Sequence, residues 1–301
     1  MKITNFREAI KEAAKLGRRR FVLPGSGGCC METLSSAVRE GLAFPIWIGD
    51  AGEGKKQFER CGIAASEGEI LEEKNAENVL DRAFELLRSR KADILMQGAA
   101  PHEAFVNRVL DREKGLRNGK TASFVSVFDP EKVPKLTMLT DTYINNFPTL
   151  EEKIGIVENA IRLAGVLGID APKIAALSAI EQVNPAIPST LDAAILAKMS
   201  ERKQFGAAVI EGPLDIDCAV SAGAAMRKGV QSPVTGRADI YLTPNVESGY
   251  LTAQLNVFIA GMPMAGVLMG TSHPVILDLP WVSIESKPVE AALAVLLCPG
   301  K

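Results

Sequence analysis

The sequence predicts an α/β fold in which mainly parallel sheets are covered by helices on both faces. Short apolar runs recur along the chain, and each is followed by a stretch with the spacing of an amphipathic helix. The connections are short and carry glycine, proline, asparagine or aspartate, as in βα units. Apolar residues make up 47% and charged residues 23% of the 301 residues, which is typical of a globular protein with a sizeable core.

The first half of the chain opens with an amphipathic helix at 1–17 and continues with strands that alternate with helices. A glycine-rich turn at 24–28 joins the first strand to a helix, whose first backbone N–H groups are available to a phosphate. The turn lacks GxGxxG spacing, so both a phosphate loop and a simple tight turn remain open. The expected strands lie at 20–23, 44–48, 69–71, 93–96, 122–128 and 135–140.

A second run of the same rhythm begins with a long helix at 150–167. Thr149 is expected to cap this helix, and Glu151 and Glu152 suit the positive end of its dipole. Two α/β domains with a cleft between them are therefore expected, with a boundary near residues 138–148. The further strands are expected at 173–178, 207–210, 238–242, 265–270 and 275–277, with helices at 191–201 and 248–260.

Charge and hydropathy argue against nucleic acid and membrane as partners. The formal net charge is −2, and no basic run is long enough to follow a phosphate backbone. The helix at 1–17 carries charges throughout, so it is not a secretory signal. No apolar run reaches the ~18 residues that a membrane-spanning helix needs. A cytoplasmic protein is therefore expected.

The cysteines predict neither a disulfide framework nor a zinc site. There are five of them, and none has CxxC spacing. Reduced thiols are expected, and no metal site. Cys29 and Cys30 begin a helix, where either a stabilised thiolate or simple packing is expected.

The stretch 264–287 concentrates polar groups between two apparently parallel strands. Thr271, Ser272, His273 and Asp278 lie at the ends of these strands. Ligands of open α/β sheets collect at the carboxyl ends of parallel strands. The sequence therefore predicts the site here. A packed or capping role for His273, and pairing of Asp278 with a local backbone donor, are the structural alternatives.

The other of the two histidines, His102, lies in a loop at 97–102 that joins a strand to a helix. A histidine can act as a base near neutral pH. A polar loop at 140–148, which contains Thr140 and Asp141, follows another buried strand and is expected to be either structural or ligand-positioning.

Six segments together resemble the phosphate acetyl/butyryltransferase (phosphotransacylase) family, and its butyryltransferase branch most closely. They cover the chain from about residue 92 to its end, and the part before residue 92 is similar mainly through REGLAFPIWIGD. The segments are ADILMQG with LDREKGLRNG, LTDTYINNFPTLEEKIGIVENA, AALSAIEQVNPAIPSTLDAA, EGPLDIDCAVSAGAA, KGVQSPVTGRADIYLTPNVESG and ESKPVEAALA.

The resemblance implies two α/β/α domains of the phosphotransacylase or isocitrate/isopropylmalate dehydrogenase type with an interdomain cleft. The first would comprise 1–140 and 268–301, and the second 141–267. It also implies a homo-oligomer, at least a dimer, that transfers an acetyl or butyryl group between coenzyme A and phosphate. No metal and no permanently bound cofactor are implied, and acyl-CoA and phosphate are the small-molecule substrates.

The chain departs from the family pattern where the family carries a Ser-Arg-x-Asp cluster. Leu279, Pro280 and Val282 stand at these positions. The family lysine after the strand at 93–96 is Gln97, and a threonine in the same loop is His102. The family Asp and Asn of a further loop are Asn245 and Tyr250. Matching positions are Gly98, Arg117, Thr140, Asp141, Glu181, Asn184, Gly212, Pro213, Asp217, Lys228, Ser232 and Gly249.

Two functions remain open on these grounds. The first is an enzyme with a rearranged site, in which His273 or His102 is the base and Ser272 donates to an oxyanion. Arg117 would then hold phosphate or form a structural ion pair, and Lys228 would hold phosphate. The expected substrate-binding residues are Gly98, Arg117, Thr140, Asp141, Asp217, Lys228, Ser232, Asn245 and Gly249.

The second function is that of an inactive paralogue which binds coenzyme A or an acyl group without phosphotransacylation. The replaced Ser-Arg-x-Asp segment favours it. A dehydrogenase-like nucleotide enzyme is a weaker third reading, because the chain has neither an intact dinucleotide loop nor metal-binding aspartates.

Overall fold

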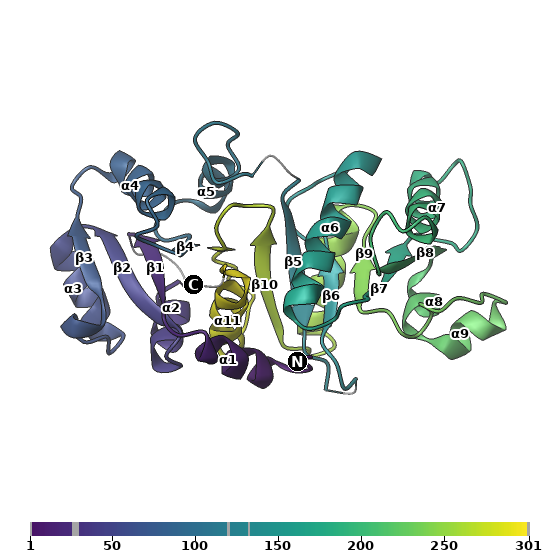
Figure 1. Ribbon diagram of the computed structural model, residues 1–301, viewed down its shortest axis with the longest axis horizontal. Coiled ribbons are helices and arrows are strands. Elements are labelled where there is room, and N and C mark those ends of the chain that lie inside the picture. The colour runs from purple at the N-terminus through teal and green to yellow at the C-terminus, as the bar shows by residue number, and fades with distance from the viewer. Residues whose placement is uncertain (1, 26–29, 119–120, 132, 300–301) are drawn as a thin grey trace. The chain divides into compact units, whose positions relative to one another are not determined.

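The computed structural model describes residues 2–25, 30–118, 121–131 and 133–299, and the chain forms two compact units (Figure 1). We call Phe6–Lys120 with Pro263–Lys301 the terminal unit, and Met1–Asn5 with Thr121–Met262 the central unit. The division falls earlier in the chain than the boundaries expected at 141 and 268. The reason is that β5 (Ser123–Phe128) pairs with β6 (Thr137–Thr140), which in turn pairs with a strand of the central unit.

The sheet of the terminal unit has the strand order β3-β2-β1-β4-β11-β10. Neighbouring strands are parallel except for the last pair. These strands are β1 (Arg19–Pro24), β2 (Ala43–Gly49), β3 (Glu69–Glu72), β4 (Ile94–Met96), β10 (Met264–Met269) and β11 (Val275–Ile276).

The prediction that the last two strands are parallel is wrong. Leu268 of β10 pairs with Val275 of β11 in the antiparallel sense. Only the five residues 270–274 connect the strands, and a parallel pair needs a crossover of a dozen or more residues. The short, glycine-containing connection therefore closes a hairpin, while β11 runs parallel to β4 on its other side.

The helices of the terminal unit bring both ends of its sequence together. Helix α11, in yellow, packs against α1, in purple, and also against α2 (Figure 1). Helix α4 contacts β1, β2 and β4. The elements are α1 (Phe6–Lys15), α2 (Cys30–Arg39), α3 (Ala51–Arg60), α4 (Ala76–Arg88), α5 (His102–Val109) and α11 (Lys287–Leu297), with short 3₁₀ turns at Ala65–Glu67 and Ile284–Ser286.

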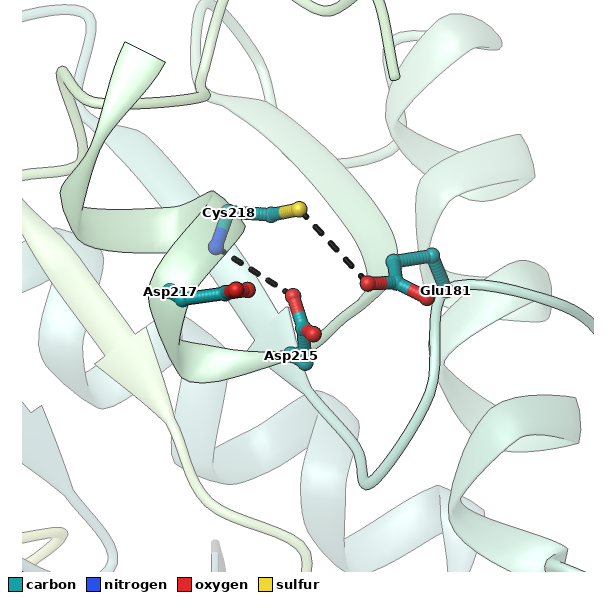
Figure 2. Close-up of side chains that lie close together, drawn as sticks. All are labelled: Glu181, Asp215, Asp217 and Cys218. Carbon is teal, nitrogen blue, oxygen red and sulfur yellow. Dashed lines mark hydrogen bonds between the residues drawn. The ribbon is translucent and has the colours of Figure 1, made fainter. Parts of the chain in front are cut away.

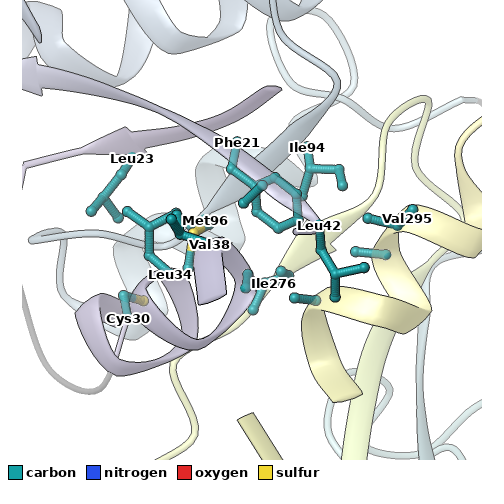
Figure 3. Packing of buried hydrophobic residues seen from close by; sticks show 14 of the residues in the cluster. Phe21, Leu23, Cys30, Leu34, Val38, Leu42, Ile94, Met96, Ile276 and Val295 are labelled. Carbon is teal, nitrogen blue, oxygen red and sulfur yellow. The ribbon is translucent and has the colours of Figure 1, made fainter. Parts of the chain in front are cut away.

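The core of the terminal unit lies under α1, α2, α3 and α11. Figure 3 shows the part of it that β1, β4, α2 and α11 contribute. Phe21 and Leu23 of β1 point into this cluster, together with Ile94 and Met96 of β4. Because successive side chains of a strand alternate between its faces, Val22 and Leu95 face the other side of the sheet, which α4 covers. A strand buried on both faces is uniformly apolar, as the sequence pattern predicts.

The central unit repeats this plan with the strand order β5-β6-β9-β7-β8. Only β5 and β6 pair in the antiparallel sense; the other pairs are parallel. The further strands are β7 (Lys173–Leu177), β8 (Val209–Leu214) and β9 (Ile240–Leu242). The helices are α6 (Leu150–Val166), α7 (Pro188–Glu201), α8 (Ile216–Val220), α9 (Ala222–Arg227) and α10 (Val246–Phe258).

The predicted cap of α6 is confirmed. Thr149 Oγ1 accepts a hydrogen bond from Glu152 N at 3.3 Å, and Glu152 Oε2 accepts one from Thr149 N at 2.8 Å. This reciprocal capping box satisfies two backbone donors at the start of the helix. Among the helices of the described residues, none combines the length and apolar character needed to cross a membrane.

Candidate functional site

In the terminal unit, a buried glutamine joins the two loops that follow β4 and β11. Gln97 Oε1 accepts a hydrogen bond from the backbone N–H of Asp278 at 3.0 Å and lies 3.0 Å from His102 Nδ1. Gln97 Nε2 donates to Ala100 O at 3.2 Å. These partners fix which end of the amide is oxygen. Because an amide oxygen only accepts, His102 Nδ1 must carry the proton and donate it.

This hydrogen bond sets the tautomer of His102 and therefore its chemistry. With the proton on Nδ1, the lone pair of the neutral imidazole lies on Nε2, which is the basic nitrogen and is buried in this conformation. Burial lowers the pKa of His102, and the nearby Asp278 carboxylate partly offsets this effect. The imidazole is therefore neutral near pH 7, as a general base must be.

The loop between β4 and α5 is fastened to the end of β1. Ala99 N donates to Pro24 O at 3.1 Å. Gly98 has a φ of 67°, and a Cβ at this position would lie 2.3 Å from Pro24 O. Only glycine combines this left-handed conformation with so close a backbone approach. Gly98 thus shapes the loop that carries His102.

A hollow of about 600 Å³ opens beside this loop at the carboxyl ends of β1 and β2. Its walls are mainly apolar and include Ala99, Ala100 and Pro101 of the His102 loop, with Asp50 and Lys74 among its polar residues. Such a partly apolar hollow at the carboxyl edge of a parallel sheet is a typical place for a ligand.

Two of the three positions at which the family cluster was expected belong to the core of the terminal unit, and the third, Pro280, is exposed. Leu279 is 0% and Val282 5% exposed. Below them, Lys287 Nζ lies 3.4 Å from Leu279 O and 3.4 Å from Glu290 Oε2, and both charged residues are 1% exposed. Burial raises the pKa of Glu290 to about 7, against the opposing effect of Lys287. The apolar replacements at 279 and 282 therefore serve packing.

Cys30 lies near these groups and is not a thiolate. It is 1% exposed, and burial, assisted by the charge of Asp278, raises its pKa to about 12. Simple packing therefore accounts for Cys30. Cys29 and the glycines of the turn at 26–28 lie outside the described residues.

Ser272 and His273 lie at the opposite edge of the same sheet. Because β11 runs parallel to β4, with Val275 opposite Leu95, residues before β11 are level with the start of β4. From 93 to 97 the chain advances four residues, which is roughly 13 Å at about 3.3 Å per residue. Ser272 and His273 are thus separated from His102, and the two histidines cannot act on the same reacting atoms.

Arg117 lies beside the turn that carries Ser272, and not beside the loop that carries His102. Arg117 forms a single antiparallel bridge with Thr271, and Ser272 N donates to Leu116 O at 2.8 Å. Ser272 Oγ lies 3.1 Å from His273 Nδ1. These contacts tie the segment around 116–117 to the turn between β10 and β11.

In the central unit, Asp141 organises the turn that follows β6. Its Oδ1 accepts from the backbone N–H of Phe124, Tyr143 and Ile144 at 2.9, 3.0 and 3.2 Å. Its Oδ2 accepts from Asn145 N at 2.9 Å and from Asn145 Nδ2 at 2.5 Å. Burial raises the pKa of Asp141, and these donors oppose the rise. With both oxygens engaged, this carboxylate shapes the loop.

Thr140, Asn245 and Gly249 lie around the same turn. Thr140 O accepts from Thr243 N at 2.7 Å, and Asn245 caps α10 by accepting from Ser248 N at 3.0 Å. A Cβ at Gly249 would lie 2.2 Å from Asp141 O. The structure therefore brings Thr140, Asp141, Asn245 and Gly249 together at the carboxyl edge of β6 and β9.

A cluster of polar side chains lies at the carboxyl ends of β7 and β8 (Figure 2). Lys228 Nζ is 2.5 Å from Glu181 Oε1 and 2.8 Å from Asp217 Oδ1, and it also pairs closely with Asp215. Lys228 lowers the pKa of Glu181 to about 2, and the carboxylates, Asp215 first, raise the pKa of Lys228.

Three carboxylates around one ammonium leave this group negatively charged. A phosphate would be repelled here, so in this conformation Lys228 does not offer a phosphate site. Glu181, Asp215, Asp217 and Cys218 present ligand atoms within 4.8 Å of one another, but Lys228 already occupies the position of a cation among the carboxylates. Ser232 accepts from Val234 N at 3.1 Å and stabilises a separate turn.

Sequence reasoning weighed Asp278 but missed the hydrogen bonds that Gln97 makes with Asp278 and His102. The replacement of the family lysine by Gln97, five residues before His102, was the available signal. It also missed the pairing of Lys228 with Asp215, for which the acidic run EGPLDID was a signal.

Comparison with known proteins gives one consistent result. A family model described as Phosphate acetyl/butaryl transferase matches residues 73–280. A phosphate butyryltransferase of Clostridium acetobutylicum is 39% identical over 300 residues, covering 99% of this chain and 100% of that protein. A phosphate acetyltransferase of Thermotoga maritima is 33% identical over 96% of this chain and 98% of its own length. A branched-chain phosphotransacylase from Enterococcus faecalis superposes with a TM-score of 0.79 at 26% identity, over 93% of this chain and 100% of that one.

Proposed function

Since this chain belongs to the phosphate acetyl/butyryl transferase family, we propose that it transfers a short acyl group, acetyl or butyryl, between coenzyme A and phosphate. The observation that carries the proposal is the hydrogen bond from His102 Nδ1 to Gln97 Oε1, 3.0 Å long, which leaves the lone pair on Nε2. Acyl-CoA and phosphate are the substrates, and no cofactor is permanently bound.

His102 acts as the general base in this proposal, and its loop must move for this, because Nε2 is buried in the structure. Nε2 takes the proton of the CoA thiol, the sulfur forms a bond to the acyl carbon of an acyl phosphate, and the bond from that carbon to the phosphate oxygen breaks. The imidazolium then returns its proton to the departing phosphate. The charge of Asp278 favours the imidazolium while it exists. In the reverse direction a phosphate oxygen attacks the thioester.

The remaining predicted site residues have supporting roles. Gly98, Thr140, Asp141, Asn245 and Gly249 shape the loops at the carboxyl edges of the two sheets, where ligands of α/β proteins bind. Arg117 and Lys228 stay predicted phosphate contacts, and Asp217 and Ser232 stay predicted substrate contacts. Phosphate binding by Lys228 requires its ammonium to leave Glu181, Asp215 and Asp217.

The protein acts in the cytoplasm as a homo-oligomer, at least a dimer. An apolar face of α10 supports the homo-oligomer. Its exposed fractions are 61% for Leu251, 58% for Leu255, 64% for Phe258 and 79% for Ile259. Their spacing puts them on one face of the helix, and a contiguous exposed apolar face marks an interaction surface. A second copy of this chain is the proposed partner. Leu255→Glu is expected to reduce the mass measured by light scattering to that of the monomer.

The test of the function is CoA release from butyryl-CoA and acetyl-CoA, with and without phosphate. Phosphate-dependent turnover is expected, and His102→Gln is expected to lower kcat/KM by about 10²–10⁴-fold, as loss of a general base does. The matched control is His273→Gln, which alters the only other histidine and should leave turnover near that of the wild type. Background turnover together with tight acyl-CoA binding by calorimetry would favour the inactive paralogue instead.

A further inference from the structure

A second hollow lies at the amino edge of the terminal unit's sheet, where β1 and β4 begin. Its volume is about 590 Å³. It is bounded on one side by the loop before β4 and on another by the turn that carries Ser272 and His273. We call it the arginine hollow, because Arg19, Arg88 and Arg90 line it, together with Asp93, Ser272 and His273.

The charges around the arginine hollow are predominantly positive. Three guanidinium groups face one carboxylate, and that carboxylate, Asp93, already accepts a hydrogen bond from Arg20 N at 2.8 Å. Arg88 donates to the backbone carbonyls of Lys114 and Gly115, the latter at 3.3 Å, and has no carboxylate partner among the described residues. Within the described part of the chain, Arg90 forms no ion pair either. The hollow therefore favours an anion.

Arg19 gives the more specific indication. It is 4% exposed, and the only hydrogen bond of its side chain within the described residues is a long one, from Nη2 to Pro299 O at 3.5 Å. Its Nε is buried and has no hydrogen-bond partner there. A guanidinium cannot lose its proton to escape burial, so an unpaired buried arginine is costly. An anion in the hollow would supply the missing acceptor.

Ser272 and His273 add polar groups to the wall of the hollow. The two side chains lie 3.1 Å apart, between Ser272 Oγ and His273 Nδ1. Burial lowers the pKa of His273; Asp93 and a hydrogen bond with the Leu87 backbone oppose this, and Arg90 adds to it. The imidazole is therefore neutral when the hollow is empty, and its environment changes when an anion enters.

We propose that the arginine hollow binds the phosphate group of a small phosphorylated metabolite, at a site separate from the His102 loop. Guanidinium groups suit phosphate because they donate parallel N–H bonds to its oxygens. The hollow is larger than a phosphate ion, so an organic part fits beside the charge. Free phosphate and a phosphate monoester share this chemistry, and the experiment uses both.

The test exploits the fact that the chain has two histidines. The full-length protein is titrated with inorganic phosphate and, separately, with ribose 5-phosphate, while the two imidazole signals are followed by NMR. His273→Gln identifies its signal by removal. A saturable shift of the His273 signal is expected with both ligands, at lower concentration for ribose 5-phosphate. A shift of the His102 signal alone would overturn the proposal.

The matched variants are Arg90→Gln and Lys91→Gln. Both remove one exposed positive charge from neighbouring positions, but only Arg90 lines the hollow. Arg90→Gln is expected to weaken ribose 5-phosphate binding on the order of tenfold, as loss of one charged hydrogen bond does, whereas Lys91→Gln has little effect. Equal losses in the two variants would mean general electrostatic attraction and would refute a built site. Turnover of both variants without added ribose 5-phosphate should equal that of the wild type.

Discussion

Replacing Gln97 by methionine removes the hydrogen bonds that hold His102 in place while keeping a side chain of similar length. Gln97 is 5% exposed, and its side chain makes three hydrogen bonds, with Asp278 N at 3.0 Å, His102 Nδ1 at 3.0 Å and Ala100 O at 3.2 Å. Each contributes about 1 kcal/mol net, so a total loss of about 3 kcal/mol in the free energy of unfolding is expected.

The same change removes the hydrogen bond that fixes the tautomer of His102. With no acceptor for Nδ1–H, the imidazole can place its proton on either nitrogen and rotate, and kcat/KM is expected to fall by about 10–100-fold, as loss of an orienting partner does. Urea unfolding and phosphate-dependent CoA release measure the two effects. Gln204→Met, at an exposed glutamine, is the control. Unchanged kcat/KM in Gln97→Met, with a measurable loss of stability, would refute the role of this hydrogen bond.

Three further predictions concern pH and packing. Because the pKa of His102 lies below its ordinary value of 6.5, kcat/KM should stay level as pH falls to that value and drop only at lower pH, and a drop already at pH 7 would contradict this. The pKa of Glu290 is raised from 4.5 to about 7, so the folded state keeps a proton that the unfolded state releases. The free energy of unfolding should therefore fall by about 3 kcal/mol as pH rises through this window, and Glu290→Gln should abolish that dependence in urea titrations at several pH values; an unchanged dependence would exclude a buried neutral Glu290. Gly249→Ala places a Cβ 2.2 Å from Asp141 O and should cost about 1–3 kcal/mol in thermal unfolding. Gly165→Ala in α6, where nothing lies within 4 Å, should stabilise by about 0.5–1 kcal/mol; equal effects would rule out the close contact.

The sequence predicted the fold well where the local signal determines the structure. The runs at β1, β2, β4 and β5 are strands because most of their side chains are buried on both faces, and this burial requires a mainly apolar pattern. Thr149 was recognised as a cap because a hydroxyl residue directly before a helix whose first turn is acidic is a local signature.

Prediction of strand direction failed for β10 and β11, and strand direction decides which edge of the sheet a residue occupies. Residues 270–274 were read as a connection between parallel strands, but the strands form a hairpin, and this places His273 at the amino edge rather than beside His102. Strand pairing is a property of the whole sheet, and five residues do not reveal it. The pairing of Lys228 with Glu181, 47 residues earlier, is equally invisible without the fold.

The replaced Ser-Arg-x-Asp segment has a physical reading that the sequence alone could not provide. Leu279 and Val282 are buried, so they reinforce the core instead of lining a ligand site. The polar groups at the carboxyl edge of this sheet are instead Gln97, His102 and Asp278, which come from the loops after β4 and β11.

The protonation state of His102 is the central claim, and ¹⁵N NMR of its imidazole tests it most directly. The spectrum is recorded near pH 7 on protein labelled at histidine, with His273→Gln to assign the two rings. A protonated Nδ1 and an unprotonated Nε2 are predicted, because Nδ1 donates to Gln97 Oε1 over 3.0 Å. A protonated Nε2 with a bare Nδ1 would contradict the account, since the proposed base would then carry no lone pair.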